Sequence, residues 1–111
     1  MATKLKQYVT PEGLVPYERW FSKLGPIAAA KVTTALTRLK NGNVSSVDPV
    51  GAGVFEYKID FGPGYRIYFA YDGEKLVILL GGGSKKRQQK DIEEAKSNWT
   101  LYKKRKKAGE R

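Results

Sequence analysis

The sequence predicts an α+β domain in which one strand, two helices and three strands follow one another and a last helix ends the chain. Two observations carry this prediction: apolar residues recur every three or four positions in the first half, and at every second position from residue 54 onward. The first spacing is that of a helix with one buried face, and the second that of a half-buried strand. No internal repeat or Pro/Ser-rich linker divides the 111 residues. Residues 1–111 are therefore expected to form a single domain.

The segment before residue 54 predicts a short strand and two helices. Residues 4–9 alternate apolar and polar side chains, as a first strand would. Thr10 and Pro11 are typical of a helix start with Thr10 as the cap, although Pro16 leaves this boundary open. The apolar stripe of this first helix consists of Leu14, Tyr17, Phe21 and Leu24. The second helix has an apolar face made of Ala28, Val32, Ala35, Leu36 and Leu39, and it ends at Asn41 and Gly42.

Three strands are predicted between residues 54 and 80. Apolar residues occupy every second position in 55–61 and again in 65–71, with a Gly-Pro-Gly turn at 62–64 between them. Residues 76–80 are apolar throughout, as in a strand buried on both faces. If the turn closes symmetrically, Asp60 lies opposite Arg66 and Lys58 lies opposite Tyr68. This antiparallel sheet would turn one face to the two helices and leave the other face polar.

Basic residues are concentrated after the predicted sheet. Residues 84–111 carry 11 of the 21 Lys and Arg residues but 4 of the 11 Asp and Glu residues. Glycines 81–83 predict a loop that leads into a final helix reaching about residue 107. The narrow apolar stripe of this helix, which predicts packing along one edge only, consists of Ile92, Ala95, Trp99 and Tyr102. The sequence leaves open whether the basic tail, residues 103–111, is ordered or disordered.

The composition excludes several classes of activity. The chain has neither Cys nor His, so it can form no disulfide, thiol nucleophile or Ser-His-Asp triad, and we expect no metal site and no cofactor. No apolar stretch is long enough to span a membrane, and a cytoplasmic protein is expected. The formal net charge of +10 favours a polyanionic partner. A charge that serves only solubility is the alternative.

Three features of the sequence could bind phosphate. Lys58 and Arg66 share the predicted polar face, where they could stabilise charge on a phosphodiester; alternatively, they only pair with Glu56 and Asp60. The glycine-rich loop could cradle an anion with its backbone N–H groups, or could be a plain connection. The basic run at 103–107 could bind phosphate backbones, or could be a solvated helix end.

Residues 53–95 carry motifs that resemble the RelE/ParE toxin superfamily. The motifs are Gly62-Pro63-Gly64-Tyr65-Arg66 within the alternating strands, and Gly81-Gly82-Gly83-Ser84-Lys85 followed by Gln88 and Asp91-Ile92. Together they are most similar to HigB-like addiction-module killer proteins, and the resemblance extends from about residue 8 to residue 100. It implies a small RelE-like fold, in which two helices pack on one face of a mainly antiparallel sheet and a basic groove occupies the other face.

The resemblance also implies an activity and roles for single residues. RelE-type members enter the ribosomal A site and cut mRNA there without a metal ion, as the RNA 2′-OH attacks the adjacent phosphate. By position, Arg66 would stabilise the phosphate, Lys58 would act at the scissile bond and Lys85 would contact phosphate. The general base would be Asp91 or Lys58. The residues expected to bind RNA are Tyr68, which could stack on a base, Lys86, Arg87, Gln88 and Lys90.

The sequence therefore predicts the toxin of a type II toxin–antitoxin system, a ribosome-dependent mRNA endonuclease that inhibits translation. The expected partners are the ribosome with mRNA in its A site and a cognate helix-turn-helix antitoxin, which would form a toxin–antitoxin hetero-oligomer. Two alternatives stay open. The chain could poison DNA gyrase, as ParE-like proteins do, or could bind nucleic acid without cutting it.

Overall fold

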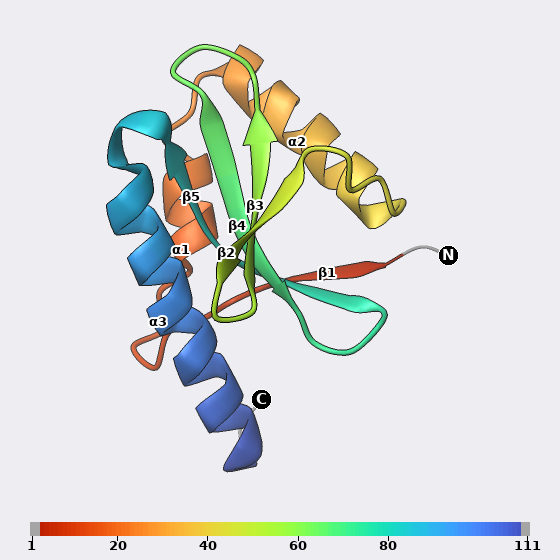
Figure 1. Ribbon diagram of the computed structural model, residues 1–111. Helices are drawn as coiled ribbons and strands as arrows, with labels where there is room; N and C mark the ends of the chain where they lie inside the picture. Colours follow the sequence, from red (N-terminus) through yellow and green to blue (C-terminus); the bar gives the residue numbers. More distant parts are fainter. Residues whose placement is uncertain (1–2, 110–111) are drawn as a thin grey trace.

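The computed structural model describes residues 3–109 as a five-stranded sheet between two layers of helix (Figure 1). The elements in chain order are β1 (Lys4–Gln7), α1 (Pro16–Phe21), α2 (Pro26–Lys40), β2 (Val47–Gly51), β3 (Val54–Ile59), β4 (Tyr65–Tyr71), β5 (Leu76–Ser84), the 3₁₀ turn η1 (Lys85–Arg87) and α3 (Gln88–Lys107). The strand order is β1-β5-β4-β3-β2; β1 runs parallel to β5, and the other neighbours are antiparallel. The predicted α+β class is confirmed, with one strand more than expected.

The two faces of the sheet bury separate apolar clusters. The first cluster joins α1 and α2 to the sheet through Tyr17, Val32, Ala35, Leu39, Tyr57, Ile59, Ile67, Phe69, Val77 and Leu79. The second joins α3 to the opposite face through Tyr8, Val54, Tyr68, Ala70, Ile78, Leu80, Ala95 and Trp99. Residues 77–80 alternate between the two clusters, so β5 is buried on both faces as its unbroken apolar run predicts.

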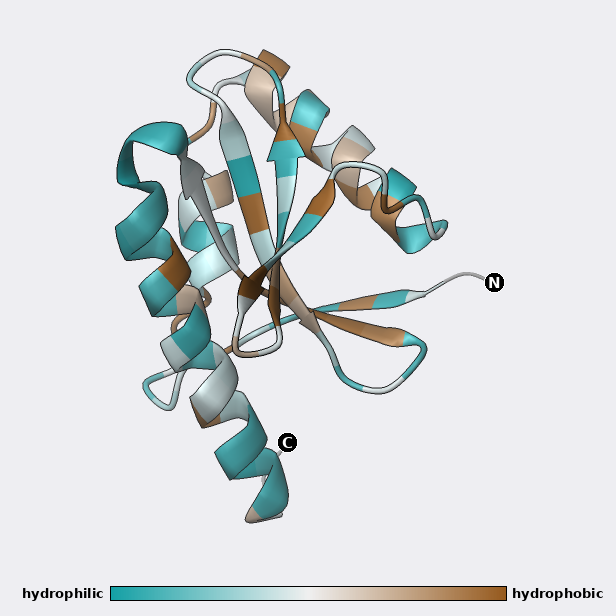
Figure 2. Ribbon diagram, in the orientation of Figure 1, coloured by the Kyte–Doolittle hydropathy of each residue, from teal (hydrophilic) through white to brown (hydrophobic). Residues whose placement is uncertain are grey.

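The face that carries Lys58 and Arg66 is not open and polar as predicted, because α3 lies along it (Figure 1). Packing of this helix along one edge only is also wrong. Ala95 and Trp99 are 1% and 8% exposed: the small side chain lets the helix approach, and the indole fills the space beside it. Most of the remaining helix surface is hydrophilic (Figure 2). The helix continues to Lys107, so the first part of the predicted tail is helical, whereas residues 110–111 lie outside the described residues.

Strand β2 is the element that the sequence analysis misses. It pairs with β3 through a tight connection at residues 52–53, where Ala52 has a φ of 56°. Its five residues show no alternation and include Pro49. Proline is tolerated there because β2 is an edge strand, with a neighbour on one side only.

Helix α1 begins five residues later than predicted from Pro11. The Thr10 hydroxyl accepts a hydrogen bond from the Leu14 N–H at 2.9 Å, and the Thr10 carbonyl accepts one from the Gly13 N–H at 2.9 Å. Thr10 therefore closes a turn and does not cap a helix. The helix starts at Pro16, whose fixed φ suits the first helical position.

The turn between β3 and β4 is longer than a symmetrical Gly-Pro-Gly turn, and this shifts the strand pairing. Ile59 pairs with Tyr65, so the turn comprises residues 60–64. Lys58 lies opposite Arg66, and Glu56 opposite Tyr68. The predicted pairs, Asp60 with Arg66 and Lys58 with Tyr68, are wrong by two residues. Because the shift is even, the same side chains still share one face.

Glycines 81–83 belong to β5 and do not form the predicted loop. A Cβ atom on Gly82 would overlap the Trp20 ring, and one on Gly83 would overlap the Asp91 carboxylate. These positions let α1 and α3 approach the strand from its two faces. The predicted anion cradle in this segment is therefore wrong, because all three glycines pair with β4 and two of them pack against side chains.

Replacing Gly82 with Ala should destabilise the protein by about 2 kcal/mol, since the new methyl group collides with the Trp20 ring. Urea unfolding would measure this loss. Gly25→Ala is the matched control: a Cβ there meets nothing within 4 Å, and φ is −69°. Equal stability of the Gly82→Ala variant and the wild type would contradict the close packing of α1 on β5.

Candidate functional site

Four polar side chains meet beneath the first turn of α3 and form what we call the Glu56 cluster: Glu56 of β3, Arg66 and Tyr68 of β4, and Gln88 of α3. The Glu56 Oε2 atom accepts hydrogen bonds from Gln88 Nε2 at 2.7 Å and from the Tyr68 hydroxyl at 3.2 Å. Arg66 Nε lies 3.5 Å from the same oxygen. Glu56 is 2% exposed, and a carboxylate this deeply buried requires such partners.

Arg66 is held on a second side by the turn that precedes β4. Its Nη1 donates to the Gly64 carbonyl at 2.7 Å, and the backbone N–H of Lys85 donates to the same carbonyl at 2.9 Å. A Cβ on Gly64 would lie 3.1 Å from Arg66 Nη1 and 3.5 Å from Lys85 Cβ. The structure therefore brings together Arg66 and Lys85, which the sequence analysis assigns to phosphate.

Lys58 lies opposite Arg66 in the strand pairing but points to a different partner. Its Nζ is 3.1 Å from Asp48 Oδ2 on β2, and both side chains are about half exposed, at 50% and 57%. An exposed pair of this kind contributes little free energy. The ammonium group can therefore leave Asp48 for a more highly charged ligand.

The sequence leaves open that Lys58 and Arg66 only pair with Glu56 and Asp60, and this pairing is present in part. Arg66 does pair with Glu56, whereas Lys58 pairs with Asp48 in place of Glu56 or Asp60. From the sequence, Glu56 is expected only as a surface partner of this kind, and its central position is not predicted. Its alternation in β3 shows which face it shares with Arg66, but only the covering by α3 makes it buried.

Tyr68 cannot stack on a nucleobase in this structure, because it is fully buried beneath α3. Burial and the neighbouring Glu56 carboxylate raise the pKa of its hydroxyl. The group is therefore a neutral hydrogen-bond donor to Glu56 at physiological pH. The predicted face is correct, and the predicted exposure is wrong because α3 covers that face.

Asp91 lies over the strand next to Arg66. Its carboxylate packs against Gly83, and Gly83 is the pairing partner of Arg66 on β5. Burial is the main reason why the pKa of Asp91 is raised above its ordinary value. A carboxylate with a raised pKa suits proton transfer near neutral pH. The role of Asp91 as the base stays a prediction, and its carboxylate lies against β5, beside the strand that carries Arg66.

A groove of about 670 Å³ runs between α1 and α3 along β5 and reaches Asp91. Basic side chains on its walls are Arg19, Lys23 and Arg87. Lys86 of η1 and Lys90 of α3 are also exposed. Gln88, in contrast, donates to Glu56, so its amide belongs to the cluster. Direct RNA contacts by the three exposed cations at residues 86, 87 and 90 stay predictions.

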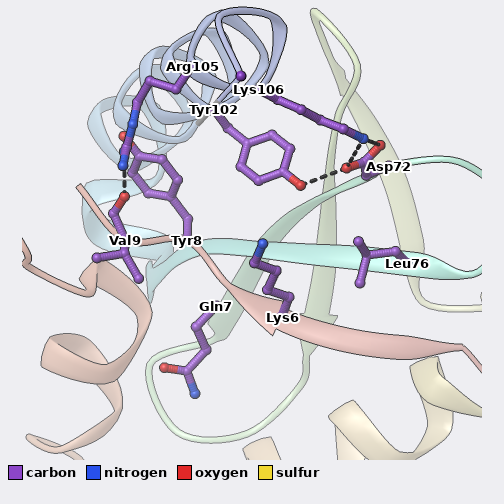
Figure 3. Close-up of a pocket in the computed structure, with 10 residues that line it drawn as sticks. Lys6, Gln7, Tyr8, Val9, Asp72, Leu76, Tyr102, Arg105 and Lys106 are labelled. Carbon is purple, nitrogen blue, oxygen red and sulfur yellow. Dashed lines mark hydrogen bonds and ion pairs between the residues drawn. The ribbon is translucent and has the colours of Figure 1, made fainter. Parts of the chain in front are cut away.

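A second cavity, of about 440 Å³, lies between β1 and the last turns of α3 and contains none of the predicted site residues (Figure 3). Beside it, the Tyr102 hydroxyl donates to Asp72 at 2.6 Å, and Lys106 Nζ lies 2.7 Å from both Asp72 oxygens. Arg105 Nη1 donates to the Val9 carbonyl at 2.7 Å. These contacts anchor the end of α3, as Gln88 anchors its start.

The described residues bring together no group of three or more acidic side chains that could hold a metal ion. Between residues 3 and 109, no helix is both long enough and apolar enough to cross a membrane.

Fold and site together define a small basic α+β protein whose central arginine pairs with a buried carboxylate. The chain belongs to the family "Phage derived protein Gp49-like (DUF891)", which matches residues 19–107. This is a toxin-like family related to RelE and HigB, and it implies an antitoxin partner. A protein of Haemophilus influenzae (strain ATCC 51907 / DSM 11121 / KW20 / Rd), described as "Uncharacterized protein", is 44% identical over 81 residues, which are 72% of this chain and 82% of that protein.

The anchor at Asp72 should make the protein sensitive to acid. Hydrogen bonds from Lys106 and Tyr102 hold the pKa of Asp72 below its ordinary value of 3.8. The folded state thus favours the ionised carboxylate, whose contribution is present above pH 3.8 and is lost as the pH falls through the lowered pKa. Asp72→Asn should cost about 1 kcal/mol at neutral pH.

Urea unfolding at about pH 6 and about pH 3 measures this effect as the free energy of unfolding. The wild type should lose more of this free energy between the two pH values than the Asp72→Asn variant, because the other carboxylates titrate in both proteins. Equal losses would show that Asp72 does not anchor α3.

Proposed function

We propose that this chain is the toxin of a type II toxin–antitoxin system and acts as a ribosome-dependent mRNA endonuclease. The observation that carries the proposal is the guanidinium of Arg66, which is held between Glu56 and the Gly64 carbonyl. The backbone N–H of Lys85 donates to the same carbonyl. A planar guanidinium fixed in this way suits the nonbridging oxygens of a phosphodiester. The family supports the toxin, and the resemblance to RelE-type proteins supports the ribosome and A-site mRNA as targets.

The proposed reaction transfers a phosphoryl group within the RNA, from the 5′-oxygen to the 2′-oxygen. The 2′-oxygen attacks the adjacent phosphorus, the bond from phosphorus to the 5′-oxygen breaks, and the products are a cyclic phosphate and a free 5′-OH. A base accepts the 2′-OH proton, and an acid donates a proton to the leaving 5′-oxygen. Arg66 would stabilise the charge on the phosphate in the transition state, and Lys58 and Lys85 would supply further positive charge. The expected antitoxin is a helix-turn-helix protein.

Arg66→Ala should lower cleavage by about 10²- to 10³-fold, as loss of one fixed donor does at comparable sites. Primer extension on mRNA from expressing cells would reveal cuts phased with codons for the wild type and none for the variant. Lys75→Ala, in the exposed turn between β4 and β5, is the control and should behave as wild type. Wild-type protein that induces stabilised gyrase–DNA complexes without such cuts would favour a ParE-like activity.

Asp91→Asn distinguishes the two candidate bases. If Asp91 accepts the 2′-OH proton, cleavage falls by about 10²- to 10⁴-fold. The stability of the variant should rise. Burial raises the pKa of Asp91 in the folded state, so the folded protein loses stability as the pH rises from the ordinary pKa of the unfolded chain to this raised pKa. The variant should therefore melt at a higher temperature than the wild type at pH 7, and the difference should shrink in acid. Undiminished cleavage would assign the base to Lys58.

A further inference from the structure

We propose that Glu56 is a positioning residue: its buried carboxylate sets the orientation of Arg66 toward phosphate and makes that orientation depend on the docking of α3. The orientation of Arg66 depends only on contacts within the chain. Its effect on catalysis rests on the proposed function.

The Arg66 guanidinium is held by contacts on two of its nitrogens. Glu56 lies on its Nε side at 3.5 Å, and the Gly64 carbonyl accepts from Nη1 at 2.7 Å. The hydrogen bond from Nη1 and the ion-pair contact at Nε together restrict rotation of the planar group. They leave Nη2 and the second Nη1 proton for a phosphate. The Arg66 side chain is 10% exposed, so a ligand reaches only a small part of it, and orientation decides which part.

Arg66 and Glu56 form an ion pair. Among the described residues, the buried Arg66 Nε has no partner within hydrogen-bond geometry, and 3.5 Å exceeds the usual 2.7–3.2 Å. The attraction is therefore electrostatic, and the contact has room to shorten. Hydrogen bonds at catalytic sites often tighten only when substrate is bound. We expect the Nε proton to approach Glu56 when Nη2 binds phosphate.

Position 56 needs a charged carboxylate to balance the charge of Arg66. Both groups that donate to Glu56, the Tyr68 hydroxyl and the Gln88 amide, are neutral at physiological pH. They fix the carboxylate but do not neutralise it. Lys58, the nearest alternative cation in the strand pairing, is paired with Asp48. The charge of Glu56 is therefore balanced by Arg66, and an amide at position 56 would leave a buried cation without its counter-ion.

Glu56 also connects Arg66 to α3. Gln88 is the first residue of this helix and Asp91 lies three residues further on, so both face the same side of the helix. Gln88 bonds to Glu56, and the Asp91 carboxylate lies against Gly83, the residue of β5 that pairs with Arg66. One buried carboxylate thus sets the arginine in place relative to the candidate base on the helix.

The test compares the wild type with Glu56→Gln, which keeps the shape of the side chain and removes its charge. Glu74→Gln makes the same change at an exposed position between β4 and β5 and is the control. The Arg66 Nε–Hε signal is observed by NMR, assigned by its loss in Arg66→Lys, and titrated with inorganic phosphate. Cleavage on ribosomes and thermal melting are measured on the same proteins.

We expect the Arg66 signal of Glu56→Gln to move toward the position of exposed arginines and to respond at least tenfold more weakly to phosphate. Cleavage should fall about 100-fold, chiefly in kcat, as for a misplaced catalytic group. The Glu74→Gln control should match the wild type in every measurement. An unchanged Arg66 signal and phosphate response in folded Glu56→Gln would overturn the proposal, whatever happens to cleavage.

The outcomes also separate this proposal from the proposed function. If the wild type cleaves no mRNA while its Arg66 signal depends on Glu56 as expected, the nuclease assignment fails and the positioning role stands. If Glu56→Gln does not fold, Gln88→Ala decides the question, because it removes a donor to Glu56 at the edge of the cluster. A changed Arg66 signal in Gln88→Ala supports the proposal, and a signal identical to that of the wild type contradicts it.

Discussion

The structure depends on one constraint: a carboxylate is buried between the sheet and a helix and must find all of its partners there. Glu56, itself on β3, receives them from β4 and from α3. Strand pairing, the turn at residues 60–64 and the docking of α3 must therefore be correct together. A register shift of one residue would send every side chain of β3 to the other face. The buried charge thus favours a single arrangement of the elements that carry the site.

Helix α3 covers one face of the sheet, and its middle and its two ends contact that face through different side chains. Its middle is apolar, with Ala95 and Trp99 against the sheet, and its two ends are held by polar contacts to Glu56 and to Asp72. The residues proposed to act on RNA lie near the start of the helix, where the Lys85 N–H of η1 and Arg66 donate to the same Gly64 carbonyl. The other end supports the helix and carries none of the predicted site residues.

Periodicity predicts correctly which side chains share a face, because side chains alternate along a strand whatever covers them. It therefore places Arg66 and Lys58 together. It cannot predict burial of that face, which depends on a helix more than twenty residues away in sequence, so Tyr68 is wrongly expected at the surface. Strand β2 is missed because a short edge strand with a proline has no alternation. Glycines 81–83 resemble a loop in sequence, although they belong to β5, where Gly82 makes room for Trp20 and Gly83 for Asp91.

The parallel pairing of β1 with β5 has a consequence for how the chain acquires its structure. Lys4 pairs with Leu76, and Gln7 with Leu79, so β1 finds its neighbour only after some seventy further residues are made. Contacts of such long separation form slowly. During synthesis, the sheet cannot be completed until β5 has emerged, and the cluster beneath α3 must form later still. A nascent chain therefore has no assembled Glu56 cluster until α3 has also left the ribosome.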